Sequence, residues 1–265
     1  MTPKLSIIIV TWNTAKITLK CVKTVKKYLS NINPQIIVVD NASTDNTISL
    51  LKKEKIIFIK NKHNIGFSKA ANIGAKNATG KYLLFLNSDI ELIDNSIIEM
   101  LNFLENNSHI GLIGPQFLNP DLSIQASVFP PQTITNAIKQ YFYGQQSFSK
   151  YTPKTKNPIS VESISGGAIM IKRDFFNKIG TWNEKFFMYY EDLDLCQKTH
   201  QQNMQVFYYP QAKIIHRHGI SGAKLADSKN QWRRLIPSSK IYHGSVKHCL
   251  IFLILWIGQK LKKRS

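Results

Sequence analysis

Apolar runs of strand length alternate with helix-like stretches through the first half of the chain, and this alternation limits the folds that it can adopt. The run LSIIIVT at residues 5–11 is typical of a strand buried on both faces. Further strands are expected at residues 35–40, 56–60, 81–86 and 110–116, with helices between them at about residues 14–28, 45–53, 67–78 and 94–105. This order predicts an α/β fold with a parallel sheet covered by helices on both faces.

Polar side chains follow three of the expected strands. They are Thr11-Trp12-Asn13, Asp40-Asn41 and Asn87-Ser88-Asp89. Open α/β sheets bind their ligands at the carboxyl ends of the strands, so the three groups together predict a binding site. Each group alone is also typical of a turn or a helix cap.

The second half of the chain has a weaker pattern. Residues 120–158 hold half of the ten prolines and show little periodicity, which predicts a long loop over the open edge of the sheet. Regular structure is expected to resume at residues 165–171, residues 186–195 are expected to form a loop that enters a helix running to about residue 202, and two short strands are expected at 206–209 and 213–216.

The C-terminal part is basic around one unbroken apolar run. No carboxylate follows Asp227, and the run CLIFLILWI covers residues 249–257. A transmembrane helix needs about 20 apolar residues, so this run is too short to cross a bilayer. Its tryptophan and basic ends favour an amphipathic helix at a membrane interface. The alternative is a helix packed on the core with a solvated basic tail.

The formal net charge is +19, from 35 Lys and Arg against 16 Asp and Glu. Such a balance predicts a polyanionic neighbour, which can be nucleic acid, an anionic membrane or a phosphorylated substrate. Modules that bind nucleic acid interleave aromatic and basic side chains. Here the aromatic run FFMYY at residues 186–190 stands beside acids instead, so we do not expect nucleic acid as a partner.

Three of the few acids lie together after that aromatic run, at Glu191, Asp192 and Asp194. Clustered carboxylates cost stability unless a metal ion, a basic group or a helix N-terminus uses them. A helix N-terminus would explain one or two of the three. An aromatic wall would also raise a carboxyl pKa towards the value that a general base needs. Asp40 fits a turn or a nucleotide contact, and His216 fits a core position or a third metal ligand.

The motifs SIIIVTWN, VVDNASTDNT, HNIGFSKAANIGAKNATGKYLLFLNSD and SGGAIMIKRDFFNKIGTWNEKFFMYYEDLDLC follow one another between residue 5 and about residue 221. In this order they resemble the family 2 inverting glycosyltransferases, and the histidine of IIHRHGIS narrows the resemblance to the rhamnosyltransferase-like branch. The resemblance implies a GT-A type fold with a Rossmann-like, mostly parallel sheet and a C-terminal amphipathic helix. It also implies a domain over residues 1–228, with a nucleotide-binding half at about 1–117 and an acceptor half at about 118–228, before a helical tail at 229–265.

The resemblance also implies roles for individual residues. Asp192 matches the catalytic base and Glu191 its neighbour, while Asp89 and His216 match ligands of a divalent cation, Mg²⁺ or Mn²⁺. The residues implied in binding the donor and its nucleotide are Thr11, Asn13, Asp40, Asn72, Asn87, Ser88, Gly166 and Gly167. Asn87 replaces the first acid of the family's DxD motif, and an amide oxygen holds such a cation less firmly than a carboxylate does.

The expected function is metal-assisted, inverting transfer of rhamnose or another hexose from a dTDP-, UDP- or GDP-sugar. The expected acceptor is a hydroxyl of a cell-surface glycan or a lipid-linked glycan precursor, at the cytoplasmic face of an anionic membrane. Two alternatives remain. A degenerate sugar-nucleotide-binding protein would have lost Asp89 or Asp192, and both are present. A nucleotidyltransferase would carry a glycine-rich loop after its first strand, where this chain has Thr-Trp-Asn-Thr.

Overall fold

The computed structural model of the protein describes residues 3–217 and 231–262. The expected alternation is present in its N-terminal half. The elements there are β1 (Leu5–Thr11), α1 (Ala15–Tyr28), the 3₁₀ helix η1 (Ser30–Ile32), β2 (Gln35–Asp40), α2 (Thr47–Leu51), β3 (Ile57–Lys60), α3 (Phe67–Lys76), β4 (Tyr82–Asn87), β5 (Ile90–Leu92), α4 (Ser96–Asn106) and β6 (Ile110–Leu118). The predicted strands and helices of this half are all found, and β5 is an addition that the pattern did not reveal.

The second half differs more from its prediction. Its elements are β7 (Ile124–Gln125), β8 (Val128–Phe129), α5 (Ile134–Tyr143), β9 (Ile159–Val161), β10 (Ser163–Ile164), β11 (Ala168–Lys172), α6 (Arg173–Lys178), α7 (Glu191–Gln201), β12 (Gln205–His216), α9 (Gln231–His243) and α10 (Ser245–Lys262). The loop predicted over residues 120–158 was wrong, because this segment contains two short strands and α5. The two strands expected between residues 206 and 216 are one strand, β12, with an irregularity between Tyr209 and Lys213.

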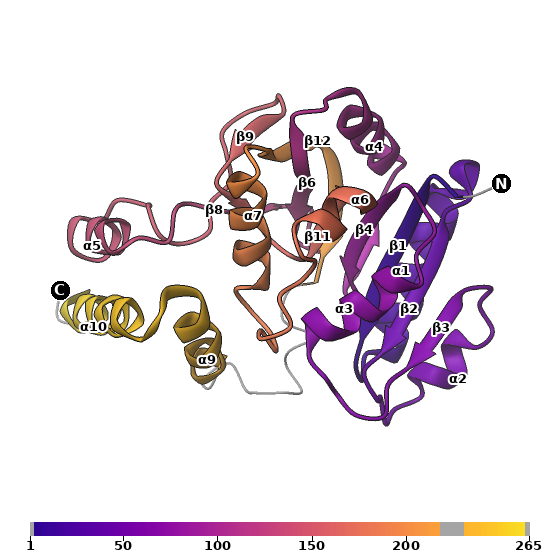
Figure 1. The fold of residues 1–265 in the computed structure, drawn as a ribbon, viewed down its shortest axis with the longest axis horizontal. Coiled ribbons are helices and arrows are strands. Elements are labelled where there is room, and N and C mark those ends of the chain that lie inside the picture. Colours follow the sequence, from indigo (N-terminus) through magenta and orange to yellow (C-terminus); the bar gives the residue numbers. More distant parts are fainter. Residues whose placement is uncertain (1–2, 218–230, 263–265) are drawn as a thin grey trace.

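The central sheet has the strand order β3-β2-β1-β4-β11-β6-β12-β5 (Figure 1). The strands β3, β2, β1 and β4 are parallel, as predicted. Strand β11 then enters antiparallel between β4 and β6, and β5 pairs antiparallel with β12 at the far edge. The sheet is therefore parallel from β3 to β4 and mixed beyond β4.

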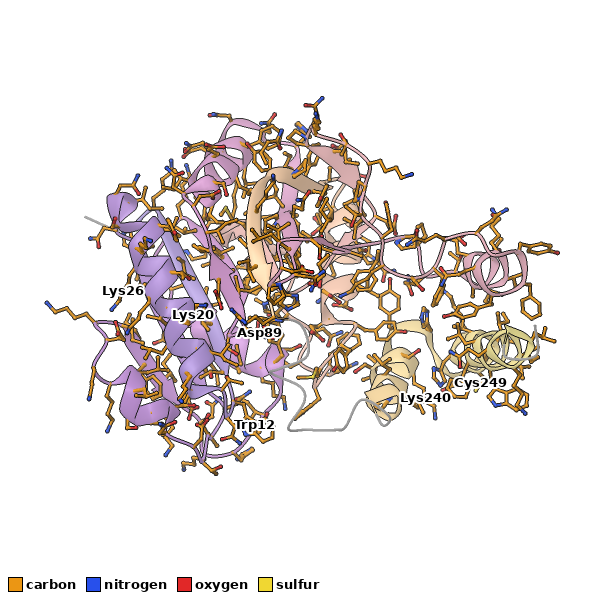
Figure 2. The ribbon with its side chains drawn as sticks, turned by 180° about the vertical axis from the view of Figure 1, so that it is seen from behind. Trp12, Lys20, Lys26, Asp89, Lys240 and Cys249 are labelled. Atoms are coloured by element: carbon orange, nitrogen blue, oxygen red, sulfur yellow. The ribbon has the colours of Figure 1, made fainter. Side chains whose placement is uncertain are left out.

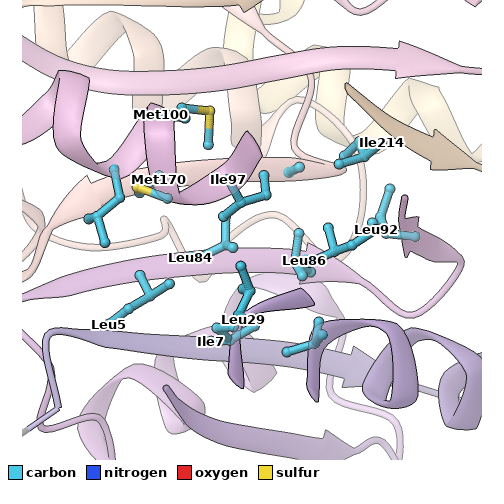
Figure 3. Close-up of a cluster of buried hydrophobic side chains, with 14 of the residues drawn as sticks. Leu5, Ile7, Leu29, Leu84, Leu86, Leu92, Ile97, Met100, Met170 and Ile214 are labelled. Carbon is cyan, nitrogen blue, oxygen red and sulfur yellow. The ribbon is translucent and has the colours of Figure 1, made fainter. Parts of the chain in front are cut away.

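Each face of the sheet carries its own hydrophobic core, because adjacent strand residues point to opposite faces. Leu84 packs in a cluster with residues of α1 and α4, which includes Leu29 and Met100 (Figure 3). Its neighbour Phe85 packs in the opposite cluster, where its ring lies 5.1 Å from that of Trp182. Two covered faces account for the continuously apolar strands that the sequence shows.

Helices α5 and α10 lie side by side away from the sheet (Figure 1). They share a small core of Ala137, Phe148 and Ile251. A Cβ placed on Gly258 of α10 would stand only 2.6 Å from Cβ of Tyr141 on α5, so the two helices touch at this glycine. We call this pair the α5–α10 lobe; Cys249 lies on it and Lys240 on the neighbouring α9 (Figure 2).

None of the described helices combines the length and the apolar character that crossing a membrane requires. The domain boundary expected between residues 228 and 229 falls outside the described residues. The C-terminal amphipathic segment consists of two helices, α9 and α10, rather than one.

Candidate active site

The three polar strand ends of the sequence lie at one edge of the sheet, because the strand register brings them there. Thr11 at the end of β1 pairs with Asp40 at the end of β2. On the other side of β1, Val10 pairs with Asn87 at the end of β4. The predicted convergence of polar groups at the carboxyl ends of neighbouring parallel strands is thus present.

Asp40 is fully buried at this edge, and only one of its two carboxylate oxygens accepts a hydrogen bond from the described residues. Its Oδ2 accepts a 3.1 Å hydrogen bond from the backbone N–H of Ser43. Its Oδ1 has no hydrogen-bond partner among the described residues. A buried carboxylate oxygen without a donor is costly, so this atom is suited to accept an N–H of a bound ligand.

Asn13 braces the loop beside Asp40. Its backbone is left-handed, with φ of 54°, which asparagine tolerates better than most residues. The side-chain Oδ1 accepts a 2.7 Å bond from the N–H of Thr44, and the Asn13 N–H donates to Oγ of Ser43 at 2.8 Å. Asn13 therefore shapes the rim of the site through the 43–45 loop.

Thr11 and Ser88 belong to a buried network of hydroxyl groups. Thr11 Oγ1 lies 2.7 Å from that of Thr18 and 3.0 Å from that of Thr14. Thr14 Oγ1 lies in turn 3.2 Å from Oγ of Ser88. The network ties the end of β1 to the Asn87-Ser88-Asp89 turn, so Thr11 supports the site from within.

Asp89 faces His216, which is far from it in the sequence. The pairing of β12 with β5 brings His216 next to Ile90 and so close to Asp89. Nε2 of His216 lies 3.5 Å from Oδ1 of Asp89, and both side chains are buried. Nδ1 of His216 lies 2.7 Å from Oε1 of Gln125. The amide nitrogen of Gln125 donates to Asn119 and to the His216 carbonyl, so its oxygen is the atom that accepts the Nδ1 proton.

This arrangement fits a divalent cation. With Nδ1 donating to Gln125, a neutral His216 directs its Nε2 lone pair at the carboxylate of Asp89, and the two repel unless a cation or a proton lies between them. Asp89 Oδ1 has no hydrogen bond within the described part of the chain. Oxygen and imidazole ligands suit Mn²⁺, and oxygen ligands suit Mg²⁺. The described residues contain no cluster of three His, Cys, Asp or Glu ligands. Asp89 and His216 are therefore a two-residue candidate site for the cation.

Gly166 and Gly167 join the two sides of the site. The N–H of Gly166 donates a 2.9 Å bond to Oδ2 of Asp192, and the carbonyl of Gly167 accepts one of 2.9 Å from Asn87. A Cβ on Gly167 would stand 2.9 Å from the Phe117 ring and 3.6 Å from Nε2 of His216. These close approaches leave no room for side chains, so the dipeptide keeps both groups near one another.

Asp192 lies in the first turn of α7, where its carboxylate accepts two backbone N–H groups. Oδ1 accepts from Leu193 at 2.9 Å, and Oδ2 accepts from Gly166. Two such bonds hold the Asp192 carboxylate in one orientation, as a general base requires.

Glu191 has a different environment from its neighbour. Burial, and after it the charge of Asp192, raise the pKa of Glu191 to about 8. Its Oε2 is buried without a hydrogen bond among the described residues. Glu191 is thus protonated at neutral pH, and a protonated carboxyl does not act as a base. The third acid, Asp194, forms an ion pair of 3.0 Å with Lys198, one helical turn on.

Lys150 is a site residue that the sequence pattern did not reveal. Its Nζ donates a 3.2 Å bond to Oγ of Ser165 and lies 4.8 Å from the ring centre of Phe129. Burial lowers its pKa, although the charges of Asp192 and Glu191 act in the opposite direction. Lys150 comes from the segment predicted as a loop, where no motif marked it; Gln125 comes from the same segment.

Asn72 does not join the other predicted donor residues. Its Nδ2 donates to the carbonyl of Trp182 at 2.9 Å and to Glu184 at 3.0 Å, and its Oδ1 accepts from the Trp182 N–H. All its polar groups therefore hold the 182–184 segment against α3. Asn72 also lines a separate cavity of about 400 Å³ together with Lys76 and Arg173.

Comparison with known proteins shows the family of the chain. Residues 6–180 match the family described as Glycosyl transferase family 2, and residues 116–259 match Glycosyl transferase family group 2. A low-salt glycan biosynthesis hexosyltransferase, Agl10 of Haloferax volcanii, is 25% identical over 93% of this chain and 79% of its own length. An N-acetylglucosaminyl-diphospho-decaprenol L-rhamnosyltransferase of Mycobacterium tuberculosis is 22% identical over 68% of this chain and 66% of its own length.

Among solved structures, GalNAc-T7 with UDP, GalNAc and Mn²⁺ superposes with a TM-score of 0.65 at 19% identity. The match covers 80% of this chain and 42% of that one, and it shows the fold, which is of the GT-A type. The family match spans more than half of the chain, and the relatives include a rhamnosyltransferase, as the motifs indicated. The protein is therefore a glycosyltransferase, and the chain belongs to glycosyl transferase family 2.

Proposed function

We propose that the protein is an inverting glycosyltransferase that moves rhamnose or another hexose from a nucleoside-diphosphate sugar to a hydroxyl group. The observation that carries this proposal is the pair of bonds made by Gly166 and Gly167. Through them the Asp192 carboxylate and the Asn87-Ser88-Asp89 turn are held by two adjacent residues, one on each side of the proposed reaction. A displacement at an anomeric carbon needs a charge-neutralising group on one side and a base on the other.

The donor nucleotide occupies the edge formed by β1 and β2. Asp40 offers its unused Oδ1 to an N–H of the base, and Asn13 holds the loop that borders it. Mg²⁺ or Mn²⁺ would be held by Asp89 and His216, and when bound it would supply positive charge to the departing diphosphate. GalNAc-T7 carries UDP and Mn²⁺ in a fold of the same type, which supports this assignment.

Asp192 takes the proton of the acceptor hydroxyl. Its two backbone bonds fix the carboxylate while leaving lone pairs on both oxygens for a third partner. A single in-line attack from the side of Asp192 inverts the anomeric configuration. Lys150 lies beside this carboxylate and adds a positive charge to the acceptor side.

The acceptor class that we propose is a cell-surface glycan or its lipid-linked precursor, met at the cytoplasmic face of the membrane. The M. tuberculosis relative has a diphospho-decaprenol acceptor in its name, which supports this class. Helix α10 supports it as well. One side of α10 packs on α5 through Ile251, while Leu250, Leu253 and Trp256 are about half exposed.

The charge around this exposed side suits an anionic lipid surface. Residues 231–262 include no carboxylate, and Lys260 lies over the ring of Trp256, 3.8 Å from its centre. Apolar side chains with a tryptophan and lysines are typical of helices that lie in the membrane interface. Helix α10 packs on α5 with one face and exposes the other, and the exposed face supports the proposal of a membrane-interface helix.

The proposed function is tested by a donor screen followed by an activity assay. The full-length protein is incubated with dTDP-rhamnose, UDP-glucose, UDP-N-acetylglucosamine or GDP-mannose, each with and without Mn²⁺, and its Tm is measured. One donor is expected to raise Tm by several degrees when Mn²⁺ is present, since ligand at 100 times its Kd stabilises by about 2.7 kcal/mol. That donor should release its nucleoside diphosphate faster with a polyprenyl-diphosphate sugar acceptor. The absence of any stabilising donor would contradict the proposal.

A further inference from the structure

The two residues before α7 have an unfavourable backbone conformation. Tyr189 and Tyr190 have φ of 71° and 69°, in the left-handed region that L-residues with large side chains rarely adopt. Tyr190 is the N-cap of α7, and its side chain makes no capping bond. Such a conformation persists only when surrounding contacts determine it. Glu191 and Asp192 follow directly, so whatever holds these tyrosines also places Asp192.

The contacts that hold this segment come from α9. Ser238 Oγ donates a 2.7 Å bond to the carbonyl of Met188, and Ser239 hydrogen-bonds the side chain of Tyr190. The ring of Tyr242 lies 5.4 Å from that of Tyr190, tilted by 39°. Both serines are buried, so these bonds are made away from competing water.

The opposite side of the segment is held by α3. The N–H of Phe67 donates a 2.8 Å bond to the carbonyl of Phe187. A Cβ on Gly66 would stand 2.6 Å from the same carbonyl, so α3 and the segment are in close contact there. Residues 187–190 are thus clamped between the sheet domain on one side and α9 on the other.

We propose that α9 is a positioning element of the acceptor site, in which Ser238 and Tyr242 hold residues 188–190 in the conformation that presents Asp192. This inference rests on the proposed function, in which Asp192 is the base. Neither residue touches the reacting atoms, so both act through Tyr189 and Tyr190. Burial raises the pKa of the Tyr242 phenol, and the nearby charges of Asp194 and Asp192 act in the same direction.

The experiment compares four substitutions of the full-length chain, using the donor found in the screen. Tyr242→Leu removes the ring contact with Tyr190, and Tyr242→Phe keeps it. Ser238→Ala removes the bond to Met188. Ile241→Ala is the matched control, because Ile241 is on the same helix and 41% exposed. The rates, the donor KM and the hydrogen exchange of backbone amides in residues 186–194 are measured for each.

Tyr242→Leu and Ser238→Ala are expected to lower kcat at least tenfold while donor KM stays within twofold. A fold damaged in general would change both constants. Amides of residues 186–194 should exchange faster in these two variants, and Tyr242→Phe and Ile241→Ala should resemble the wild type in every readout. Wild-type kcat and exchange in Tyr242→Leu would overturn the inference. If the wild type turns over no donor, the proposed function fails, and the exchange data still test whether α9 holds the segment.

Discussion

Gly166 donates its backbone N–H to Oδ2 of Asp192 at 2.9 Å, across 26 residues of sequence. A backbone donor keeps its position when side chains around it move, so it orients the carboxylate firmly. The next residue, Gly167, accepts a bond from Asn87 beside the metal-ligand candidates. The short stretch between β10 and β11 therefore links Asp192 to the Asn87-Ser88-Asp89 turn.

Asp192→Asn should lower the rate of transfer by about 10²–10⁴-fold, the usual contribution of a general base. Donor binding should remain near normal, because Asp192 lies on the acceptor side. Asp194→Asn is the matched control, since Asp194 pairs with Lys198 and should retain most of the rate. Product release is measured by liquid chromatography and donor binding by calorimetry. Full turnover by Asp192→Asn would exclude this residue as the base.

Asp89→Ala should remove the dependence of donor binding on Mn²⁺. Asp89 and His216 are the proposed cation-ligand pair, and the loss of the carboxylate leaves a single imidazole. Donor affinity is titrated by calorimetry at several Mn²⁺ concentrations, with Asp121→Ala in an exposed turn as the control. If Mn²⁺ strengthens donor binding to the same extent in Asp89→Ala as in the wild type, the metal lies elsewhere.

Gln125→Leu should weaken the apparent affinity for Mn²⁺ by about 10–100-fold, as loss of an outer-shell partner commonly does. Gln125 accepts the Nδ1 proton of His216 and so directs Nε2 towards Asp89. Gln125→Glu keeps an acceptor oxygen and should stay near wild-type affinity. Manganese binding is followed by electron paramagnetic resonance, which needs no turnover. Equal affinities for both variants would show that the orientation of His216 is set by other contacts.

Glu191→Gln should stabilise the protein at alkaline pH. Because the pKa of Glu191 is raised from 4.5 to about 8, the folded state binds more protons than the unfolded chain within that window. The free energy of unfolding of the wild type therefore falls as pH rises from about 4.5 to 8, because ionisation of Glu191 is disfavoured in the folded state. Glutamine does not ionise, so the variant does not lose this stability. The Tm of Glu191→Gln should exceed that of the wild type by roughly 2–4 °C at pH 8, the shift that about 1 kcal/mol produces in a chain of this size.

The comparison is made by differential scanning fluorimetry at pH 5 and pH 8. At pH 5 the two proteins should melt together, since Glu191 is protonated in the fold and only the unfolded chain begins to titrate. Glu162→Gln is the control, because it makes the same chemical change at an exposed glutamate and should not change Tm in a pH-dependent way. A Tm difference that is constant between the two pH values would contradict the raised pKa.

The parallel half of the fold could be predicted because its strands are continuously apolar and its helices are local in sequence. Helix α5 could not, since the residues that make it stable lie on α10, more than a hundred positions away. Ala137 is buried against Ile251, and Tyr141 against Gly258. Nothing within residues 120–158 indicates these partners.

The site shows the same division. The acids and glycines at strand ends were found from their types and from the family motifs. Gln125, Lys150 and Ser238 act through contacts across 91, 15 and 50 positions, and each is an ordinary polar residue in its own segment. Asn72 shows that a motif residue can also have a structural contact, because its side chain holds the Trp182 loop.

The exposed side of α10 gives the last prediction. A double substitution, Leu253→Glu with Trp256→Glu, should abolish binding to vesicles of phosphatidylglycerol and phosphatidylcholine, because it places charge among apolar contacts and removes the interfacial tryptophan. The wild type should bind these vesicles and release them as salt rises, since lysines contribute to the attraction. Ile57→Glu, at an exposed apolar position on β3, should bind like the wild type. Co-sedimentation measures all three proteins, and equal binding by the double variant would show that α10 is not the lipid-facing surface.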